Sequence, residues 1–257
     1  MLCDMVAKDK IKVASINMDV KWHDKHHNLS ETARVINSFC QGCDLVVLPE
    51  MFATGFTFDK DMAEDKQGMI VTAVERMAAD NHIAICGTYL ASDGRELYNR
   101  CFFIMPDGSC CIYDKHHLFS LGGENLHLTA GDERTFFNYL GWNITMFVCY
   151  DLRFPKWMRN DGNAYDIVLL PANWPAKREY AWRQLQIARA IENEAYVVTC
   201  NRTGIDAAGM EYMGNSMIID YAGQSVGIDE SCIVTAELDK HQLMAFRSKY
   251  RFWQDAD

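Results

Sequence analysis

The chain has 257 residues, of which 49% are hydrophobic and 23% are charged, and its formal net charge is −10 at pH 7. This length suits one large α/β domain or two small domains, and the acidic balance argues against a nucleic-acid partner. No linker, repeat or low-complexity stretch divides the sequence, so we expect one domain over residues 1–257, with a short N-terminal extension at residues 1–10.

The first ten residues have no apolar segment followed by a cleavage site, and no apolar run approaches the ~20 residues that a membrane span needs. We therefore expect a cytoplasmic protein with no membrane partner. An acidic surface does not attract an anionic substrate, so such a substrate would need a local positive group in its pocket.

Short apolar runs rich in β-branched residues predict buried strands. They lie at residues 13–16, 45–48, 83–90, 144–148, 167–170 and 196–198. Helical periodicity is found at residues 29–39, 69–79 and 182–191. The sequence PDGS at residues 106–109 is a turn signal that predicts a β-hairpin over residues 97–114. The sum is a mixed sheet with helices on its outer faces.

The spacing of the ten cysteines does not resemble a small secreted disulfide scaffold. Cys40 and Cys43 form a C-x-x-C pair, but no second pair follows at zinc-finger spacing. The adjacent Cys110 and Cys111 fall in the predicted hairpin. We expect free thiols that mostly serve as small core residues, and no bound metal.

Four predicted strands end in polar or reactive side chains, namely Glu50, Lys115, Cys149 and Asn173. Ligands of open α/β sheets bind beyond the carboxyl ends of the strands, so these groups would meet if the strands share a sheet and a direction. Taken singly, each has a simpler explanation: the charged residues as solvated turn residues, the cysteine as core and the asparagine as a turn former.

Together these groups suit nucleophilic catalysis. An ammonium lowers the pKa of a nearby thiol, and a carboxylate within hydrogen-bond reach can take its proton. The backbone N–H of Tyr150 follows Cys149 and could face an oxyanion. Pro155 predicts the first turn of a helix running through residues 157–159, which would place the nucleophile between a strand end and a helix start.

Three blocks in this order resemble the motifs of the nitrilase superfamily of carbon–nitrogen hydrolases, and the resemblance extends from about residue 11 to residue 257. The blocks read LPEMFATGF at residues 48–56, YDKHHLF at 113–119 and VCYDLRFP at 148–155. The block ARAIEN at residues 188–193 is similar to a helix of the family. Within the superfamily, ANWP at residues 172–175 and FWQDAD at 252–257 are most similar to the omega-amidase branch.

The resemblance implies an α/β fold of the four-layer α-β-β-α sandwich type. It implies an enzyme without a cofactor that forms a homodimer or higher homo-oligomer near the helix after the nucleophile. The implied reaction releases ammonia from the terminal amide of a small 2-oxo dicarboxylic acid monoamide, such as 2-oxoglutaramate or 2-oxosuccinamate, through a cysteine thioester.

Carried over residue by residue, the resemblance implies that Cys149 is the nucleophile and Glu50 the general base. Lys115 is then the oxyanion donor, together with the backbone N–H of Tyr150. Glu124, in the loop after the lysine, matches a second glutamate of the family and would hold Lys115 and the substrate in place.

The substrate-binding residues are less strongly indicated. A 2-oxo acid carries a carboxylate, for which Arg178 is the first candidate and Arg202 the second. Trp174 and Phe119 are candidates for the walls of the pocket, with Asn173 at its edge.

Other interpretations stay open. A nitrilase, an N-carbamoyl hydrolase or a deaminated-glutathione amidase would use the same reacting residues with another pocket. A non-catalytic scaffold has no need of Glu50, Lys115 and Cys149 together. A zinc or redox protein using Cys40 and Cys43 would show bound metal or a disulfide.

Overall fold

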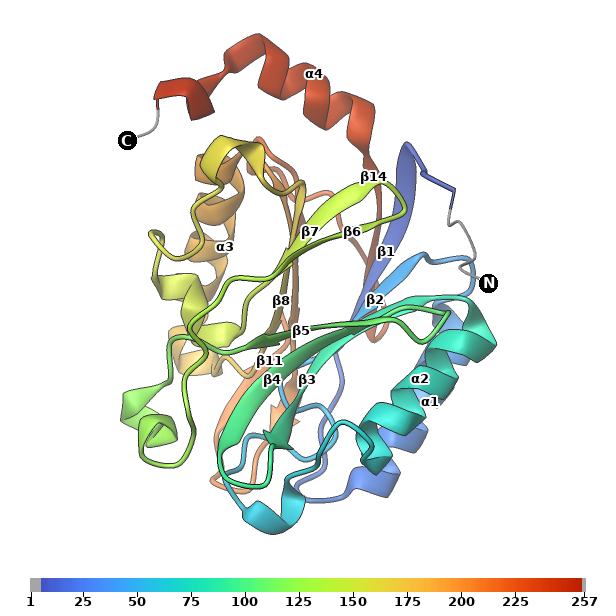
Figure 1. The fold of residues 1–257 in the computed structure, drawn as a ribbon, viewed down its shortest axis with the longest axis vertical. Helices are drawn as coiled ribbons and strands as arrows, with labels where there is room; N and C mark the ends of the chain where they lie inside the picture. The colour runs from blue at the N-terminus through green and yellow to red at the C-terminus, as the bar shows by residue number, and fades with distance from the viewer. Residues whose placement is uncertain (1–5, 256–257) are drawn as a thin grey trace.

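The computed structural model describes residues 6–255. Two β-sheets face each other at its centre (Figure 1). The larger sheet has the strand order β13 (Ile228–Glu230), β14 (Ile233–Asp239), β1 (Lys10–Ile16), β2 (Leu45–Val47), β3 (Ala84–Ser92), β4 (Leu97–Ile104), β5 (Cys110–Asp114). The smaller sheet has the order β12 (Ile218–Ile219), β9 (Tyr196–Asn201), β8 (Ile167–Ala172), β7 (Trp142–Met146), β6 (Phe136–Tyr139). A separate hairpin consists of β10 (Thr203–Ile205) and β11 (Glu211–Met213).

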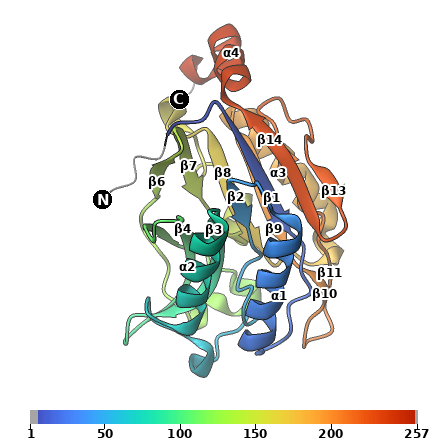
Figure 2. The same ribbon diagram turned by 90° about the vertical axis from the view of Figure 1, so that its right-hand side faces the viewer.

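Helices cover the outer faces of both sheets. These are α1 (Lys25–Phe39) and α2 (Met69–Asn81) on the larger sheet and α3 (Glu179–Asn193) on the smaller one. The two views agree on this order of layers (Figure 1 and Figure 2). The last helix, α4 (Lys240–Tyr250), follows β14 at one end of the sheets. The four-layer sandwich that the resemblance implies is therefore confirmed.

Alternation along the strands explains the layers, because successive strand residues point to opposite faces. In β2, Val46 packs in the cluster beneath α1 and α2, whereas Leu45 and Val47 pack in the cluster between the sheets. The side chain of Asp24 accepts a hydrogen bond from His27 N and so caps the start of α1.

The strand directions bring functional loops to one end of the sandwich. The strands β1, β2 and β3 are parallel, and antiparallel β4 returns the chain so that β5 runs in the direction of β2. In the smaller sheet β7, β8 and β9 are parallel. The loops after β2, β5, β7 and β8 carry the reactive residues that the sequence singles out.

Two sequence predictions are wrong. The apolar runs form two sheets rather than one mixed sheet, since short buried runs do not say which strands pair. Residues 155–158 form a turn rather than a helix, and the helical turn lies earlier, as a 3-10 segment at Cys149–Arg153. The first strand, β1, begins at Lys10, whereas the sequence predicted it from residue 13. Residues 1–5 of the expected N-terminal extension lie outside the described part. That residues 1–257 form a single domain stays a prediction.

Candidate active site

Three charged side chains form a buried network at the end of the sandwich that carries the loops. The Lys115 Nζ donates to Glu50 Oε1 at 2.9 Å and to both carboxylate oxygens of Glu124, at 3.1 and 2.9 Å. Glu50 and Lys115 are each 1% exposed, and Glu124 is fully buried. Charges this deeply buried are tolerated only when they are paired, so the network fixes the relative positions of all three groups.

Two members of the network follow the ends of strands, and the third lies in the loop after β5. Glu50 lies in the turn after β2, and Lys115 follows directly on β5, where its backbone N–H donates to Asn99 O of β4 at 3.0 Å. Glu124 begins a 3-10 turn at Glu124–Leu126, and its Oε2 accepts from Phe119 N at 2.6 Å.

The charge state of Lys115 follows from these contacts. Burial lowers the pKa of the ammonium, but the negative charges of Glu124 and Glu50 outweigh it, and the pKa of Lys115 is raised above its ordinary value. Lys115 therefore stays protonated at neutral pH and can stabilise negative charge.

Cys149 is the first residue of the 3-10 segment that follows β7, and its backbone φ is +43°. Left-handed backbone at a residue other than glycine is strained and occurs often at functional sites. Burial and the Glu50 charge together raise the pKa of this thiol, while Lys115 and a hydrogen bond from the Asn173 backbone oppose the rise. The resting sulfur is therefore a protonated thiol that needs a base.

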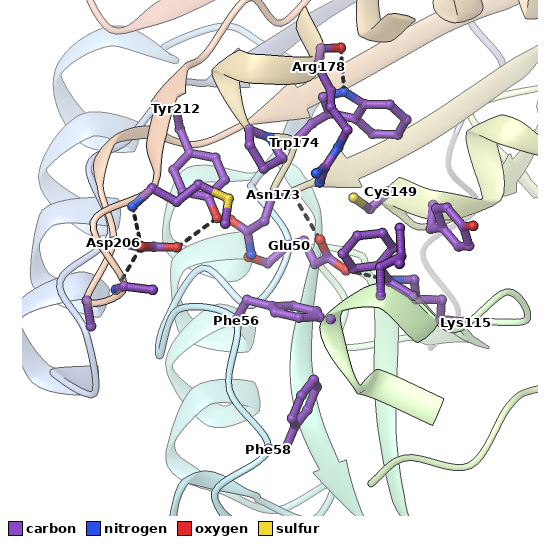
Figure 3. A pocket seen from close by; sticks show the side chains of 18 of the residues that line it. Glu50, Phe56, Phe58, Lys115, Cys149, Asn173, Trp174, Arg178, Asp206 and Tyr212 are labelled. Carbon is purple, nitrogen blue, oxygen red and sulfur yellow. Dashed lines mark hydrogen bonds and ion pairs between the residues drawn. The ribbon is translucent and has the colours of Figure 1, made fainter. Parts of the chain in front are cut away.

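Glu50, Lys115 and Cys149 border a cavity of about 850 Å³. Figure 3 shows the sulfur of Cys149 pointing toward the Glu50 carboxylate, with Phe56 and Phe58 on the side away from Arg178. Aromatic rings form much of the wall, contributed by Phe56, Phe58, Phe119, Tyr150, Trp174 and Tyr212.

Two arginines line the cavity without a carboxylate partner among residues 6–255. The Arg178 guanidinium lies over the Phe119 ring at 5.1 Å, and the Arg153 guanidinium lies over the Trp174 ring at 4.8 Å. Neither is in an ion pair in the part of the chain that the structure describes. Both are partly exposed, so they can bind an anion that enters the cavity.

Asp206, the other acidic residue of the cavity wall besides Glu50, is already occupied. Its Oδ1 accepts from the backbone N–H groups of Ala208 and Met210, and its Oδ2 accepts from the Tyr212 hydroxyl at 2.9 Å. Asp206 thus shapes the β10–β11 hairpin and is not free to pair with the arginines.

Asp151 joins the nucleophile turn to the loop after β5. Its Oδ2 accepts from Val148 N at 3.0 Å and from the Tyr113 hydroxyl at 2.7 Å. Its Oδ1 accepts from His117 N at 2.9 Å and lies 2.8 Å from His117 Nδ1. One buried carboxylate therefore ties together the segments that carry Cys149 and Lys115.

The structure brings most of the residues singled out by the sequence to this cavity. Those that line it are Glu50, Lys115, Phe119, Cys149, Tyr150, Asn173, Trp174 and Arg178. Glu124 lies behind Lys115 rather than on the wall. Arg202 is a wrong candidate, because its side chain is buried beneath the Tyr212 ring, where it donates to Val20 O at 2.9 Å.

Sequence reasoning missed Asn99, Asp151 and Arg153. A signal for Asn99 was present, since it alternates with Leu97 and Cys101 and so lies on the buried face of β4. Arg153 lies four residues after Cys149, inside a motif already singled out. Asp151 gave no separate signal, because its role depends on contacts with a distant loop.

Some features outside the cavity bear on the alternatives. Cys40 and Cys43 are buried free thiols, and no group of three or more His, Cys, Asp or Glu side chains within residues 6–255 is arranged to hold a metal. None of the helices in the described part of the chain is long and apolar enough to span a membrane.

Known proteins resemble this chain over nearly its full length. Residues 12–248 match the model of the carbon–nitrogen hydrolase family. The chain is 38% identical over 250 residues to omega-amidase YafV of Escherichia coli K12, covering 96% of this chain and 97% of that protein. It is 30% identical over 253 residues to a 2-oxoglutaramate amidase of Bacillus subtilis, covering 96% and 97%.

A solved structure has the same fold. The carbon–nitrogen hydrolase superfamily protein XC1258 of Xanthomonas campestris, whose crystal structure holds an arsenic adduct in the active site, superposes with a TM-score of 0.92. It is 36% identical, over 96% of this chain and 97% of that one. Together with its buried network and cavity, these matches show that the chain belongs to the carbon–nitrogen hydrolase family.

Proposed function

We propose that this protein is an omega-amidase. It hydrolyses the terminal amide of a small 2-oxo dicarboxylic acid monoamide, such as 2-oxoglutaramate or 2-oxosuccinamate, and releases ammonia. The names of the relatives in Escherichia coli and Bacillus subtilis support the amide class.

One observation carries the proposal. The cavity that holds a thiol, a carboxylate and an ammonium also holds two guanidinium groups, on Arg153 and Arg178, that have no carboxylate partner within residues 6–255. The first set suits the opening of an amide, and the second suits the free carboxylate of a 2-oxo acid.

In the first half of the reaction the Cys149 sulfur attacks the amide carbon and its proton passes to Glu50. The negative charge that develops on the amide oxygen is stabilised by the Lys115 ammonium and by the backbone N–H of Tyr150, which stands in the first turn of the 3-10 segment. The carbon–nitrogen bond then breaks, Glu50 returns the proton to the nitrogen, and ammonia leaves a thioester on the enzyme.

In the second half a water molecule attacks the thioester carbon as Glu50 takes one of its protons. The carbon–sulfur bond breaks, the proton returns to sulfur, and the 2-oxo dicarboxylic acid is released. Glu124 transfers no proton in this scheme. It keeps Lys115 in position through two hydrogen bonds.

Substrate selection takes place in the rest of the cavity. Arg178 binds the substrate carboxylate, Arg153 assists it, and Trp174 and Phe119 hold the two guanidinium groups by their ring faces. Asn173, the residue before Trp174, connects this binding region to the reacting residues, since its backbone N–H donates to Glu50 Oε2 at 2.9 Å.

An ammonia-release assay across a panel of amides tests the proposal. The panel contains 2-oxoglutaramate, 2-oxosuccinamate, succinamate without the oxo group, and butyramide without a carboxylate. We expect kcat/KM to be highest for the two oxo acids, lower without the oxo group, and lower again without the carboxylate.

An aliphatic nitrile, an N-carbamoyl amino acid and deaminated glutathione complete the panel. Higher kcat/KM for any of these three would replace the omega-amidase assignment with the corresponding activity. Equal rates for butyramide and 2-oxoglutaramate would show that the enzyme does not select its substrate by the carboxylate.

We also propose that two or more copies assemble in the cytoplasm near the segment that follows Cys149. The exposed side chains of Tyr180 and Ile191 on α3, 80% and 51% accessible, supply apolar surface there. Sedimentation measurements with Ile191→Asp test this, and a wild-type monomer at working concentration would contradict it.

A further inference from the structure

Asn99 contacts every charged member of the buried network. Its Nδ2 donates one hydrogen bond to Glu50 Oε1 at 2.7 Å and another to Glu124 Oε1 at 3.0 Å. Its backbone carbonyl accepts from Lys115 N at 3.0 Å. The two carboxylates are thus bridged twice, once by the Lys115 ammonium and once by the Asn99 amide.

The orientation of this amide is set by the two anions. An ionised carboxylate only accepts hydrogen bonds, so the amide must present its NH2 group to both glutamates. Its Oδ1 is buried and has no hydrogen-bond partner in the described part of the chain. Leaving a buried acceptor unsatisfied is unfavourable, so the two donor contacts of the same amide are the ones that this position serves.

The consequence for Glu50 concerns which of its oxygens can take a proton. A carboxylate oxygen accepts about two hydrogen bonds, and Oε1 already accepts from Lys115 and from Asn99. Within residues 6–255, Oε2 accepts one hydrogen bond, from Asn173 N at 2.9 Å. In Figure 3 the Cys149 sulfur lies on the side of the Glu50 carboxylate where the dashed line from Asn173 ends, which is the Oε2 side.

We propose that Asn99 is a positioning residue that occupies Oε1 of Glu50 together with Lys115, so that Oε2 is the oxygen that takes the Cys149 proton. Asn99 is suited to this task because it is neutral. It orients both glutamates without cancelling their charge, whereas a second ammonium would neutralise the base. The inference rests on the proposed role of Glu50 as general base.

The test is Asn99→Ala, compared with wild type by steady-state kinetics on 2-oxoglutaramate over a range of pH. We expect kcat to fall about 10²-fold, the lower end of what a positioned general base contributes, with KM unchanged. The acid limb of the kcat/KM profile should move to higher pH, because the ionised base has lost a donor. Asn99→Ser keeps one O–H donor and should give intermediate values, and it carries the test if the alanine variant does not fold.

Asn160 offers a matched control. It is 4% exposed, lies outside the cavity lining, and donates from Nδ2 to two backbone carbonyls, those of Tyr165 and Asn193. Asn160→Ala should lower thermal stability and leave the pH profile where it is. An Asn99→Ala enzyme that behaves in the same way, with its acid limb unmoved, overturns the inference.

A measurement without substrate separates this inference from the proposed function. The rate of Cys149 alkylation by iodoacetamide, followed by mass spectrometry over the same pH range, should slow in Asn99→Ala and shift to higher pH. If wild type releases no ammonia from 2-oxo acid amides but the alkylation shift is observed, only the proposed substrate fails. If the alkylation profiles of wild type and variant coincide, the role of Asn99 fails.

Discussion

The charged side chains on the two sides of the cavity differ in burial and in ion pairing. On the reacting side, Lys115 is held between Glu50 and Glu124, and all three are at most 1% exposed. On the binding side, the guanidinium groups of Arg153 and Arg178 rest on ring faces and remain partly exposed, with no ion-pair partner within residues 6–255.

The buried charges hold the reacting groups in position, whereas the partly exposed charges are suited to binding the substrate. Buried paired charges are held in one geometry, because moving one of them leaves another uncompensated at a cost of several kcal/mol. Partly exposed guanidinium groups stacked on rings are less destabilised when no anion is bound. Charge-assisted hydrogen bonds stabilise them further when an anion binds. Damage on the reacting side should therefore appear in kcat and in stability, and damage on the binding side should appear in KM.

The largest effect should come from Cys149→Ala. Without the nucleophile no thioester forms, and we expect kcat to fall by more than about 10⁴-fold with the thermal unfolding curve nearly unchanged, because little volume is lost. Cys200→Ala, at a fully buried thiol outside the cavity, is the control and should keep turnover. Substantial ammonia release by the Cys149 variant would end the covalent scheme.

Lys115→Met should be next in size and should affect two properties at once. Losing an oxyanion donor lowers kcat by about 10²–10³, and two buried carboxylates left facing each other lower the free energy of unfolding by about 3–5 kcal/mol. Kinetics and denaturant titration measure the two effects. Lys25→Met breaks a partly exposed pair with Glu64 and should cost some stability but no turnover. Full activity without Lys115 would refute its role.

Arg178→Ala tests the binding side. A charge-assisted hydrogen bond contributes about 1.5–3 kcal/mol, so KM for 2-oxoglutaramate should rise about 10-fold to 100-fold while kcat changes little. Hydrolysis of butyramide, which has no carboxylate, should be unaffected. The exposed neighbour Lys177, changed to alanine, controls for loss of surface charge. A fall in kcat with KM unchanged would place Arg178 on the reacting side instead.

The sequence predicted the reacting side better than the binding side. Glu50 and Cys149 each follow an apolar, largely buried strand, and such strands end in predictable places because burial leaves few alternatives. Lys115 follows the edge strand β5, whose end is indicated by the hairpin turn before it. Those three residues meet although β2 and β5 belong to one sheet and β7 to the other. Strand order and sheet membership depend on pairing across the whole chain, which short apolar runs do not encode.

The binding side depends on details that no local pattern carries. Arg178 and Arg202 are both arginines after buried strands, yet one reaches the cavity and the other is buried under Tyr212. The helix predicted from Pro155 fails for a similar reason. The Asp151 carboxylate caps the chain at Val148, so the helical turn begins at Cys149 and is complete before the proline.

Asp151→Asn should have the smallest effect of the four, and it tests whether the reacting side is held together from outside the charged network. An asparagine has one acceptor oxygen in place of two, so it cannot accept from both the nucleophile turn and the His117 loop. We expect a loss of about 1–3 kcal/mol in the free energy of unfolding and a fall in kcat smaller than that of Lys115→Met, with KM unchanged. Asp161→Asn, which alters an exposed pair with Arg134, should cost less than about 1 kcal/mol and leave kcat alone. Equal behaviour of the two variants would mean that the Cys149 turn holds its strained backbone without help, and that pairing within the network is enough to position the reacting side.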